Sequence, residues 1–455
     1  MSTPPRQIKL GAFVQATGHH VAAWLHPGAE PDAGHSLAHY VELAKAAEAA
    51  KFDMLFVADS PGGFGDFEDP EVFARNAKTA HFEPVTLWSA LSAHTRHIGF
   101  VATSSTTYED PYTTARKFAS LDWISGGRAA WNVVTTGADV SANFSQSAQV
   151  PHADRYSRAE EYIDVVKGLW DSYEDDALLR DRESGVFVDP EKVHLLNHRG
   201  EHFQVRGPLN VGRPPQGHPV VIQAGASEAG RELAGRTAEV VFTANLELAD
   251  AQEFYADIKA RASRYGRGPD QVLIMPGIFP VLGGTEAEAK ANYEYIQSLV
   301  HPSVAWSILR RHYQGQDLSG YSLDDLAPPL PNDTNGNKSR LKLVSDLVER
   351  ERPTLRKLYR AVSTARGHRT VVGTPEQIAD AIQQWFDQGA ADGFNLMPPV
   401  LPQGLHDFVD QVLPILRRRG LFRTEYEGRT LRENLALARP LNRYAAERAA
   451  RAAAE

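Results

Sequence analysis

The chain of 455 residues is 42% hydrophobic and 23% charged, which is typical of a globular protein with a large core. Its net charge is −9 and no long basic run occurs, so nucleic-acid binding has no support. Cysteine is absent, which excludes disulfides, thiolate catalysis and thiolate metal sites.

Short apolar segments alternate with amphipathic ones along most of the chain. The apolar segments predict buried strands at 8–14, 53–58, 98–103, 129–134, 219–224, 239–243, 272–281 and 393–397. Helices are predicted between them at 36–50, 86–94, 111–125, 155–173, 228–236, 249–265 and 375–388. Apolar strands separated by helices are typical of a parallel sheet covered on both faces. About eight such units favour an α/β fold of the (β/α)8 TIM-barrel type over a doubly wound sheet.

Two stretches interrupt this alternation. Residues 175–217 contain a hairpin-like pattern, and residues 285–370 are mostly helical around a Pro/Asn/Gly-rich turn region. We therefore predict one barrel domain over 1–420 with insertions at about 175–217 and 285–370, and a C-terminal helical arm over 421–455. Long insertions on a barrel are usually lids or interface elements.

A turn of small residues follows the strand at 219–224. Ala226 and Ser227 stand where a helix begins, and free N–H groups at a helix start form a seat for phosphate. Ser227 as a simple N-cap explains the same residues.

Polar residues also stand at the predicted C-terminal ends of two strands, where barrels form sites, and a third lies inside an otherwise apolar strand. These are Asp59, Thr103 and Asn132. A buried amide such as that of Asn132 must be hydrogen-bonded, either to a ligand or within the protein. A turn aspartate and a strand threonine are the structural alternatives for the other two.

Histidines and aromatic residues supply further candidates. His20, in the loop after the first strand, and His312, in the long insertion, are candidate acids or bases. A surface histidine pair, His19 with His20, is the alternative. Three phenylalanines at strand ends, Phe13, Phe56 and Phe242, are candidates for lining a substrate.

Several classes of function lack support in the sequence. No apolar run reaches the ~18 residues that span a bilayer, and the first 15 residues lack a signal-peptide core. We expect a cytoplasmic protein without a membrane partner. No HExxH motif, P-loop or GxGxxG fingerprint occurs, so we expect no metal and no nicotinamide site.

The amino-acid sequence from WNVVT at 131–135 to YIDVVKGLW at 162–170 closely resembles that of one protein family. It is similar to the bacterial-luciferase-like, flavin-dependent monooxygenases that include nitrilotriacetate monooxygenase component A, dibenzothiophene sulfone monooxygenase and pristinamycin synthase. The resemblance covers nearly the whole chain and is most specific at 97–170 and 219–242.

The resemblance implies a two-component oxygenase. Reduced FMN would come from a separate NAD(P)H-dependent reductase, react with O2 to a peroxyflavin and insert one oxygen atom into a small organic substrate. The residues that match the family's flavin contacts are His152, Tyr156, Asp59, Thr103 and, at the phosphate, Ala226 with Ser227. Homodimers or homotetramers are expected.

Two alternatives use the same barrel differently. One is a deazaflavin-dependent oxidoreductase that transfers hydride, and the other is a non-catalytic flavin-binding protein.

Overall fold

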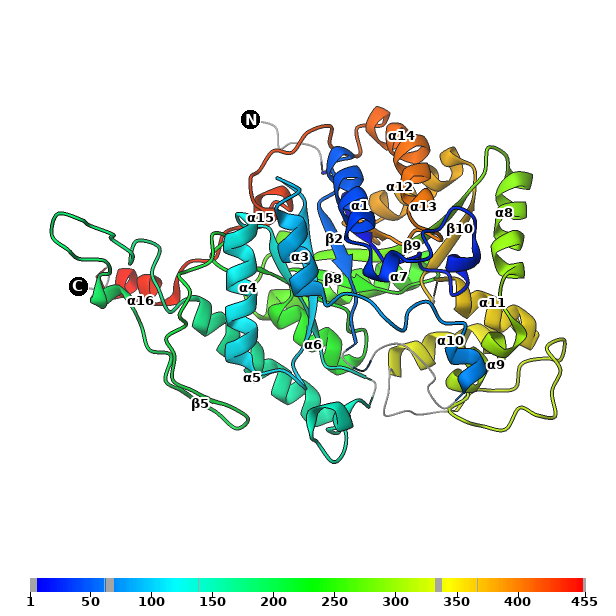
Figure 1. Cartoon of the computed structure of the whole chain (residues 1–455), viewed down its shortest axis with the longest axis horizontal. Helices are drawn as coiled ribbons and strands as arrows, with labels where there is room; N and C mark the ends of the chain where they lie inside the picture. The colour runs from blue at the N-terminus through cyan, green and yellow to red at the C-terminus, as the bar shows by residue number, and fades with distance from the viewer. Residues whose placement is uncertain are drawn as a thin grey trace.

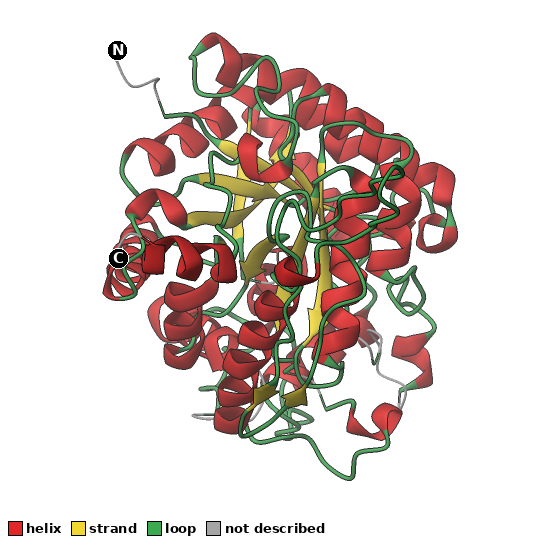
Figure 2. Cartoon of the chain, turned by 90° about the vertical axis from the view of Figure 1, so that its left-hand side faces the viewer, coloured by secondary structure: helices red, strands yellow, loops and turns green. Residues whose placement is uncertain are grey.

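The computed structural model describes residues 6–60, 62, 69–137, 139–331, 338–365 and 367–452. Its centre is a closed barrel of eight parallel strands, enclosed by helices (Figure 2). The barrel closes because β11 pairs with both β1 and β9, and β8 pairs with β9. This confirms the predicted (β/α)8 fold and all eight predicted strands. The strands are β1 (Lys9–Phe13), β2 (Met54–Val57), β3 (Gly99–Ser105), β4 (Ala129–Val134), β7 (Val220–Gln223), β8 (Val240–Thr243), β9 (Leu273–Leu282) and β11 (Gly393–Leu396).

The seven predicted helices are all present, with small shifts at their ends. They are α1 (Leu37–Ala49), α3 (Pro84–Ser92), α4 (Pro111–Ser125), α5 (His152–Trp170), α6 (Glu228–Thr237), α7 (Leu248–Arg264) and α12 (Pro375–Asp387). α3 begins two residues earlier than predicted because Glu83 caps it and Pro84 opens it. α5 begins at His152, three residues before the predicted start at Arg155. No side chain caps its first turn, so a capping residue did not mark this start in the sequence.

Shorter helices complete the frame. These are α2 (Pro70–Phe73), α13 (Gln403–Asp407), the π-helix η6 (Phe408–Val412), α14 (Leu413–Arg418) and the 3-10 turns η1 (Ala23–Leu25), η2 (Ala33–His35), η3 (Ser141–Phe144), η4 (Pro190–Lys192) and η5 (Pro269–Gln271). In the described part of the chain, no helix is both long and apolar enough to cross a membrane.

Side chains alternate between the two faces of the barrel wall. Residues such as Val101 and Ile222 face the interior and pack with Phe13 and Phe56. The alternate residues of each strand, such as Trp131 of β4, face outwards and pack against the helices. This period of two is what a parallel barrel requires, because every strand is buried on both faces.

The two long insertions have the predicted secondary structure. Residues 198–205 form an antiparallel hairpin of β5 (His198–Arg199) and β6 (Gln204–Val205), as predicted. The second insertion is mostly helical and builds its own apolar core. Its helices are α8 (Glu286–Ser298), α9 (Pro302–His312), α10 (Lys338–Glu351) and α11 (Leu355–Ala365).

One strand was not predicted. β10 (Arg369–Gly373) pairs in parallel with the C-terminal half of β9, beyond the ring of eight. β9 has ten residues and therefore extends past the barrel far enough to hold this extra partner. The pairing joins two segments about 90 residues apart in sequence, and no local pattern predicts it.

The C-terminal segment lies beneath and beside the barrel. Leu431 of α15 (Leu431–Asn434) packs into the interior at the N-terminal end of the strands. α16 (Arg443–Ala452) lies next to the first insertion, away from the barrel (Figure 1). Tyr444 stacks there on His194, with ring centroids 4.0 Å apart. The division into a barrel domain and an arm stays a prediction.

Candidate active site

The C-terminal ends of the barrel strands bring several predicted site residues to one end of the molecule. Thr103 of β3 and Asn132 of β4 are register partners, and Asp59 lies just after β2. Ala226 and Ser227 follow β7, the next strand in the ring after β4. We call this end of the barrel the mouth.

Ser227 and Tyr156, which are 71 residues apart in sequence, meet at the mouth. Ser227 caps α6 by accepting a hydrogen bond from the N–H of Gly230 at 3.2 Å, and its hydroxyl donates to the Tyr156 hydroxyl at 3.3 Å. Gly225 allows close packing in this turn, since a Cβ there would lie only 3.0 Å from the Gly230 backbone. Two hydroxyls at the positive end of a helix form a cradle that suits a phosphate group.

Two arginines lie near this cradle, and one of them holds the β7–α6 turn in place. Arg231 donates to the carbonyl of Ala226 at 3.0 Å and so holds the β7–α6 turn in place. Arg155, the neighbour of Tyr156, is 1% exposed, and burial lowers the pKa of its guanidinium. His152 is the first residue of α5, but its side chain lies outside the described residues.

Asn132 carries an unsatisfied acceptor inside the barrel. Its amide nitrogen donates to Thr103 Oγ1 at 2.9 Å, and Thr103 Oγ1 donates to the carbonyl of Val57 at 2.9 Å. Asn132 is 2% exposed, yet its Oδ1 has no hydrogen-bond partner among the described residues. A buried acceptor of this kind costs about 1–3 kcal/mol unless a bound molecule satisfies it.

Asp59 has a partner that the sequence did not reveal. It accepts a hydrogen bond from His81 Nε2 at 3.0 Å, and both side chains are mostly buried. The pair joins the end of β2 to the loop before α3.

Phe13, Phe56 and Phe242 form an aromatic cluster inside the barrel. The rings of Phe13 and Phe56 stack with centroids 4.4 Å apart, and Phe242 meets Phe13 edge-on at 5.3 Å. His19 packs on Phe13, and His368 stacks on Phe242. The cluster is almost fully buried and closes the barrel interior below the mouth. Contact with a substrate stays a prediction.

His20 is completely buried, so the alternative of a surface histidine pair is wrong. Its Nδ1 accepts the N–H of Ala22 at 3.2 Å, which places the ring proton on Nε2. Burial lowers the pKa of His20 to about 3, and the neighbouring Gln297 side chain opposes this shift only weakly. The ring is therefore neutral near pH 7, and its Nε2 has no hydrogen-bond partner among the described residues.

Gln297, a neighbour of His20, belongs to α8 of the second insertion. The Gln297 amide nitrogen donates to Thr364 Oγ1 and to the carbonyl of Arg360. Because Gln297 belongs to α8 and Thr364 to α11, these bonds tie the two helices together. His312 ends α9 and is half-buried. Its place in the chemistry stays a prediction.

Four polar side chains near the predicted site were missed by the sequence analysis. His19 was noticed only as a partner of His20, and nothing in the local pattern marked His81, Gln297 or His368. His81, Gln297 and His368 each contact a distant segment of the chain. Within the described ranges, no group of three or more His, Cys, Asp and Glu side chains is arranged to hold a metal.

Comparison with known proteins places these observations in context. Residues 14–392 match the protein family described as luciferase-like monooxygenase. The chain is 54% identical over 447 residues to N-acetyl-S-(2-succino)cysteine monooxygenase of Bacillus subtilis (strain 168), covering 98% of this chain and 100% of the relative. It is 48% identical to nitrilotriacetate monooxygenase component A of Aminobacter aminovorans, covering 96% and 98%.

The fold is also similar to solved structures. Riboflavin lyase, solved with modified FMN and its substrate riboflavin, superposes with a TM-score of 0.85 at 33% identity, covering 96% of this chain and 97% of that one.

Proposed function

Because the chain belongs to the luciferase-like monooxygenase family and is thus a flavin-dependent, oxygen-incorporating enzyme, we propose that it is the oxygenase of a two-component system. It would take reduced FMN from a separate NAD(P)H:FMN reductase and transfer one atom of O2 to a small organic substrate. The name of one relative, nitrilotriacetate monooxygenase component A, supports a partner component. Dependence on a reductase that uses NAD(P)H would place the reaction in the cytoplasm.

The mouth residues fit FMN at both of its ends. The Ser227–Tyr156 cradle at the start of α6 offers hydroxyls and helix N–H groups to a phosphate. The unpartnered Oδ1 of Asn132 offers an acceptor to an N–H of the isoalloxazine ring system. This orphaned acceptor is the observation that carries the proposal, because it needs a donor that the described protein does not supply.

Bound reduced FMN supplies the two electrons that activate O2. The protein residues have positioning roles. Ser227 and Tyr156 hold the phosphate, and Asn132, supported by Thr103, orients the ring edge. The His81–Asp59 pair stiffens the rim beside them. The phenylalanine cluster closes the barrel below the mouth and keeps water out of the reaction site.

The second insertion supplies the other wall. His20, buried in the loop after β1, lies beside Gln297, whose amide ties α8 to α11. We propose that this contact keeps the insertion over the mouth, where it shields reactive oxygen chemistry from solvent. His312, at the end of α9, is a further candidate on this wall.

The cradle is tested by placing a negative charge in it. Ser227→Asp keeps an N-cap side chain, since aspartate caps helices as well as serine does. It should nevertheless weaken FMN binding by about tenfold or more through repulsion of the phosphate. Thr285→Asp, at the exposed N-cap of α8, is the matched control and should leave the affinity unchanged. Equal affinity for FMN in wild type and Ser227→Asp would refute the phosphate assignment.

The reaction is tested with 18O2, FMN, NADPH and a flavin reductase over a panel of small organic substrates. Incorporation of one labelled atom into product supports the oxygenase. Hydride transfer from a reduced deazaflavin, without incorporation of oxygen, would support the first alternative. Binding of reduced FMN without product from any substrate would favour the non-catalytic reading.

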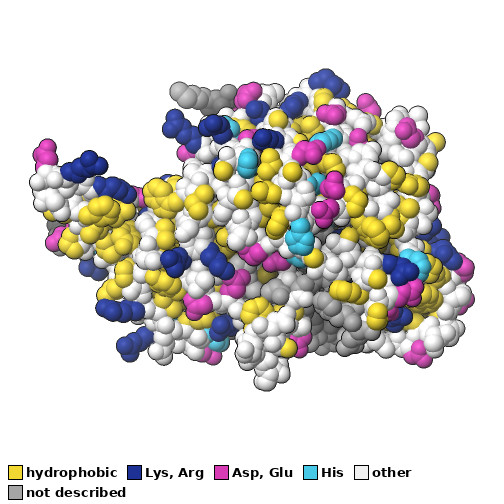
Figure 3. Space-filling model, in the orientation of Figure 1, with side chains coloured by type: hydrophobic (Ala, Val, Ile, Leu, Met, Phe, Trp, Pro, Cys, Tyr) yellow, Lys and Arg dark blue, Asp and Glu magenta, His cyan; other side chains and the backbone are white. Residues whose placement is uncertain are grey.

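We also propose a homodimer or homotetramer. Large apolar side chains are exposed on the first insertion, with Phe187 63% exposed, and on the segment before α16, with Leu441 80% exposed. Yellow apolar surface gathers on this projecting end in Figure 3. Phe187→Asp should shift the mass measured by light scattering towards the monomer, and an unchanged mass would exclude this surface.

A further inference from the structure

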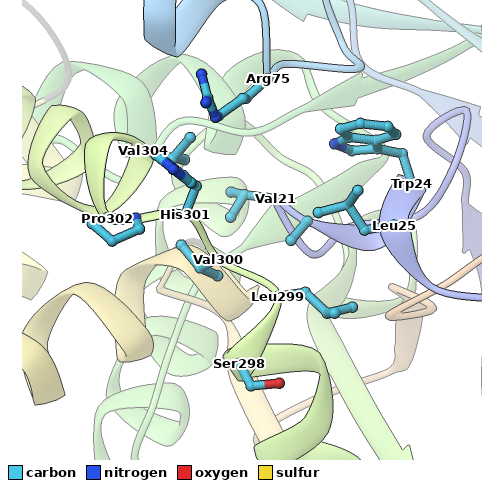
Figure 4. A pocket seen from close by; sticks show the side chains of 11 residues that line it. Val21, Trp24, Leu25, Arg75, Ser298, Leu299, Val300, His301, Pro302 and Val304 are labelled. Atoms are coloured by element: carbon cyan, nitrogen blue, oxygen red, sulfur yellow. The ribbon is translucent and has the colours of Figure 1, made fainter.

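A pocket of about 360 Å³ lies beside the mouth, between the loop after β1 and the linker from α8 to α9. Val21 and Leu25 form one wall, and Val300 and Val304 form the other (Figure 4). Its volume falls in the range of small-molecule sites, about 300–1,000 Å³.

The pocket stands on the side of the barrel opposite the phosphate cradle. In the ring of eight strands, β1 and β7 are separated by three strands in either direction. The cradle follows β7, whereas Val21 and Ala22 follow His20 in the loop after β1. Ser298, on the other wall, follows Gln297 directly.

The lining is mostly apolar, and its polar side chains are Ser298, His301 and the cation Arg75. Trp24, Leu25 and the valines supply apolar surface, and the guanidinium of Arg75 borders it (Figure 4). Arg75 donates to the carbonyl of Glu71 at 2.8 Å and lies 3.5 Å from the Glu71 carboxylate. This ion pair is half-exposed on both sides, and such pairs are weak. A ligand carboxylate can therefore compete for the guanidinium, with a bidentate geometry that the Glu71 contact lacks.

We propose that this pocket binds an organic carboxylate with a compact apolar body, and that it holds the part of the substrate remote from the reacting atom. The second half of this proposal rests on the proposed function. The apolar body fills the space between the valines, and the carboxylate pairs with Arg75. Binding energy gained this far from the reacting atom orients the substrate at the mouth.

The experiment measures binding of 3-phenylpropanoate to the full chain without cofactor by calorimetry, and compares it with the neutral 3-phenylpropan-1-ol. The carboxylate should bind about tenfold more tightly. Arg75→Gln should abolish that preference. Arg350→Gln, an exposed arginine paired with Glu351, is the matched control and should preserve it.

Filling the pocket provides the second arm. Val304→Trp should abolish binding of both compounds, and Leu25→Trp provides the same test at a more exposed position if the first variant folds poorly. Equal affinity for acid and alcohol in the wild type, or undiminished binding in the filled variants, would overturn the proposal. FMN affinity is measured in parallel. If the wild type binds FMN but not 3-phenylpropanoate, the pocket proposal alone fails. If it binds 3-phenylpropanoate but not FMN, the proposed function alone fails.

Discussion

Replacement of Asn132 by leucine tests whether the amide of this residue binds a ligand or only stabilises the fold. Leucine has nearly the same size, and it removes both the hydrogen bond to Thr103 and the buried Oδ1 that lacks a partner. Loss of the hydrogen bond costs about 1 kcal/mol, while removal of the unsatisfied acceptor returns about 1–3 kcal/mol. The free energy of unfolding of the cofactor-free protein should therefore stay unchanged or rise by up to about 2 kcal/mol.

The same variant should bind FMN less well. One hydrogen bond lost to the flavin corresponds to about 1 kcal/mol, or roughly a fivefold weaker affinity. The assay combines urea unfolding, followed by circular dichroism, with titration of FMN fluorescence. A shift in the urea midpoint at constant slope reports stability.

Asn442→Leu is the matched control. This buried asparagine donates to the carbonyls of Asp171 and Tyr173 and accepts from the N–H groups of Tyr444 and Ala445, so all its hydrogen-bonding groups are satisfied. Its replacement should lower stability by about 2–4 kcal/mol without affecting FMN. If Asn132→Leu is destabilised like this control and retains wild-type FMN affinity, the reasoning about the orphaned acceptor is wrong.

Three further predictions concern buried charges and the cradle. Arg423→Met should cost about 3–5 kcal/mol in urea unfolding, because it leaves the completely buried Asp53 carboxylate without its cation; adding Asp53→Asn should restore part of the loss, and no recovery would contradict the pairing. The pKa of His20 is lowered from 6.5 to about 3, so its neutral form stabilises the fold fully above pH 6.5 and this contribution is lost as the pH falls towards 3. His20→Gln should therefore flatten the acid-side fall of the thermal midpoint, and an equally steep fall would count against the buried neutral ring. Tyr156→Phe should weaken FMN binding about fivefold with little change in the urea midpoint, whereas unchanged binding would remove Tyr156 from the cradle.

Much of the barrel was predictable because its signals are local. Apolar runs of four to ten residues marked all eight strands. Helix α4 was predicted with its exact bounds, since Asp110 caps it, Pro111 opens it and Gly126 ends it with a positive φ of 71°. α5 was displaced by three residues because its start carries no such cap.

The candidate site was predictable only in part. Strand ends pointed to Thr103 and Ser227, because the C-terminal ends of barrel strands meet on one side. Asn132 was marked as an amide inside an otherwise apolar strand. Which side chains touch was not predictable. The hydroxyl contact of Ser227 with Tyr156 joins α6 to α5, and the bond of His81 to Asp59 joins a loop to β2.

The sequence by itself determined the order and type of the elements, and with them the parallel barrel, because hydrophobic period and capping act over a few residues. Only the tertiary structure decided that β10 pairs with the overhang of β9, that Leu431 seals the base of the barrel and that His20 is buried and neutral. Each of these depends on segments that packing brings together from distant parts of the chain. Burial, and with it the protonation state of a histidine, is set by those neighbours rather than by the residues beside it in sequence.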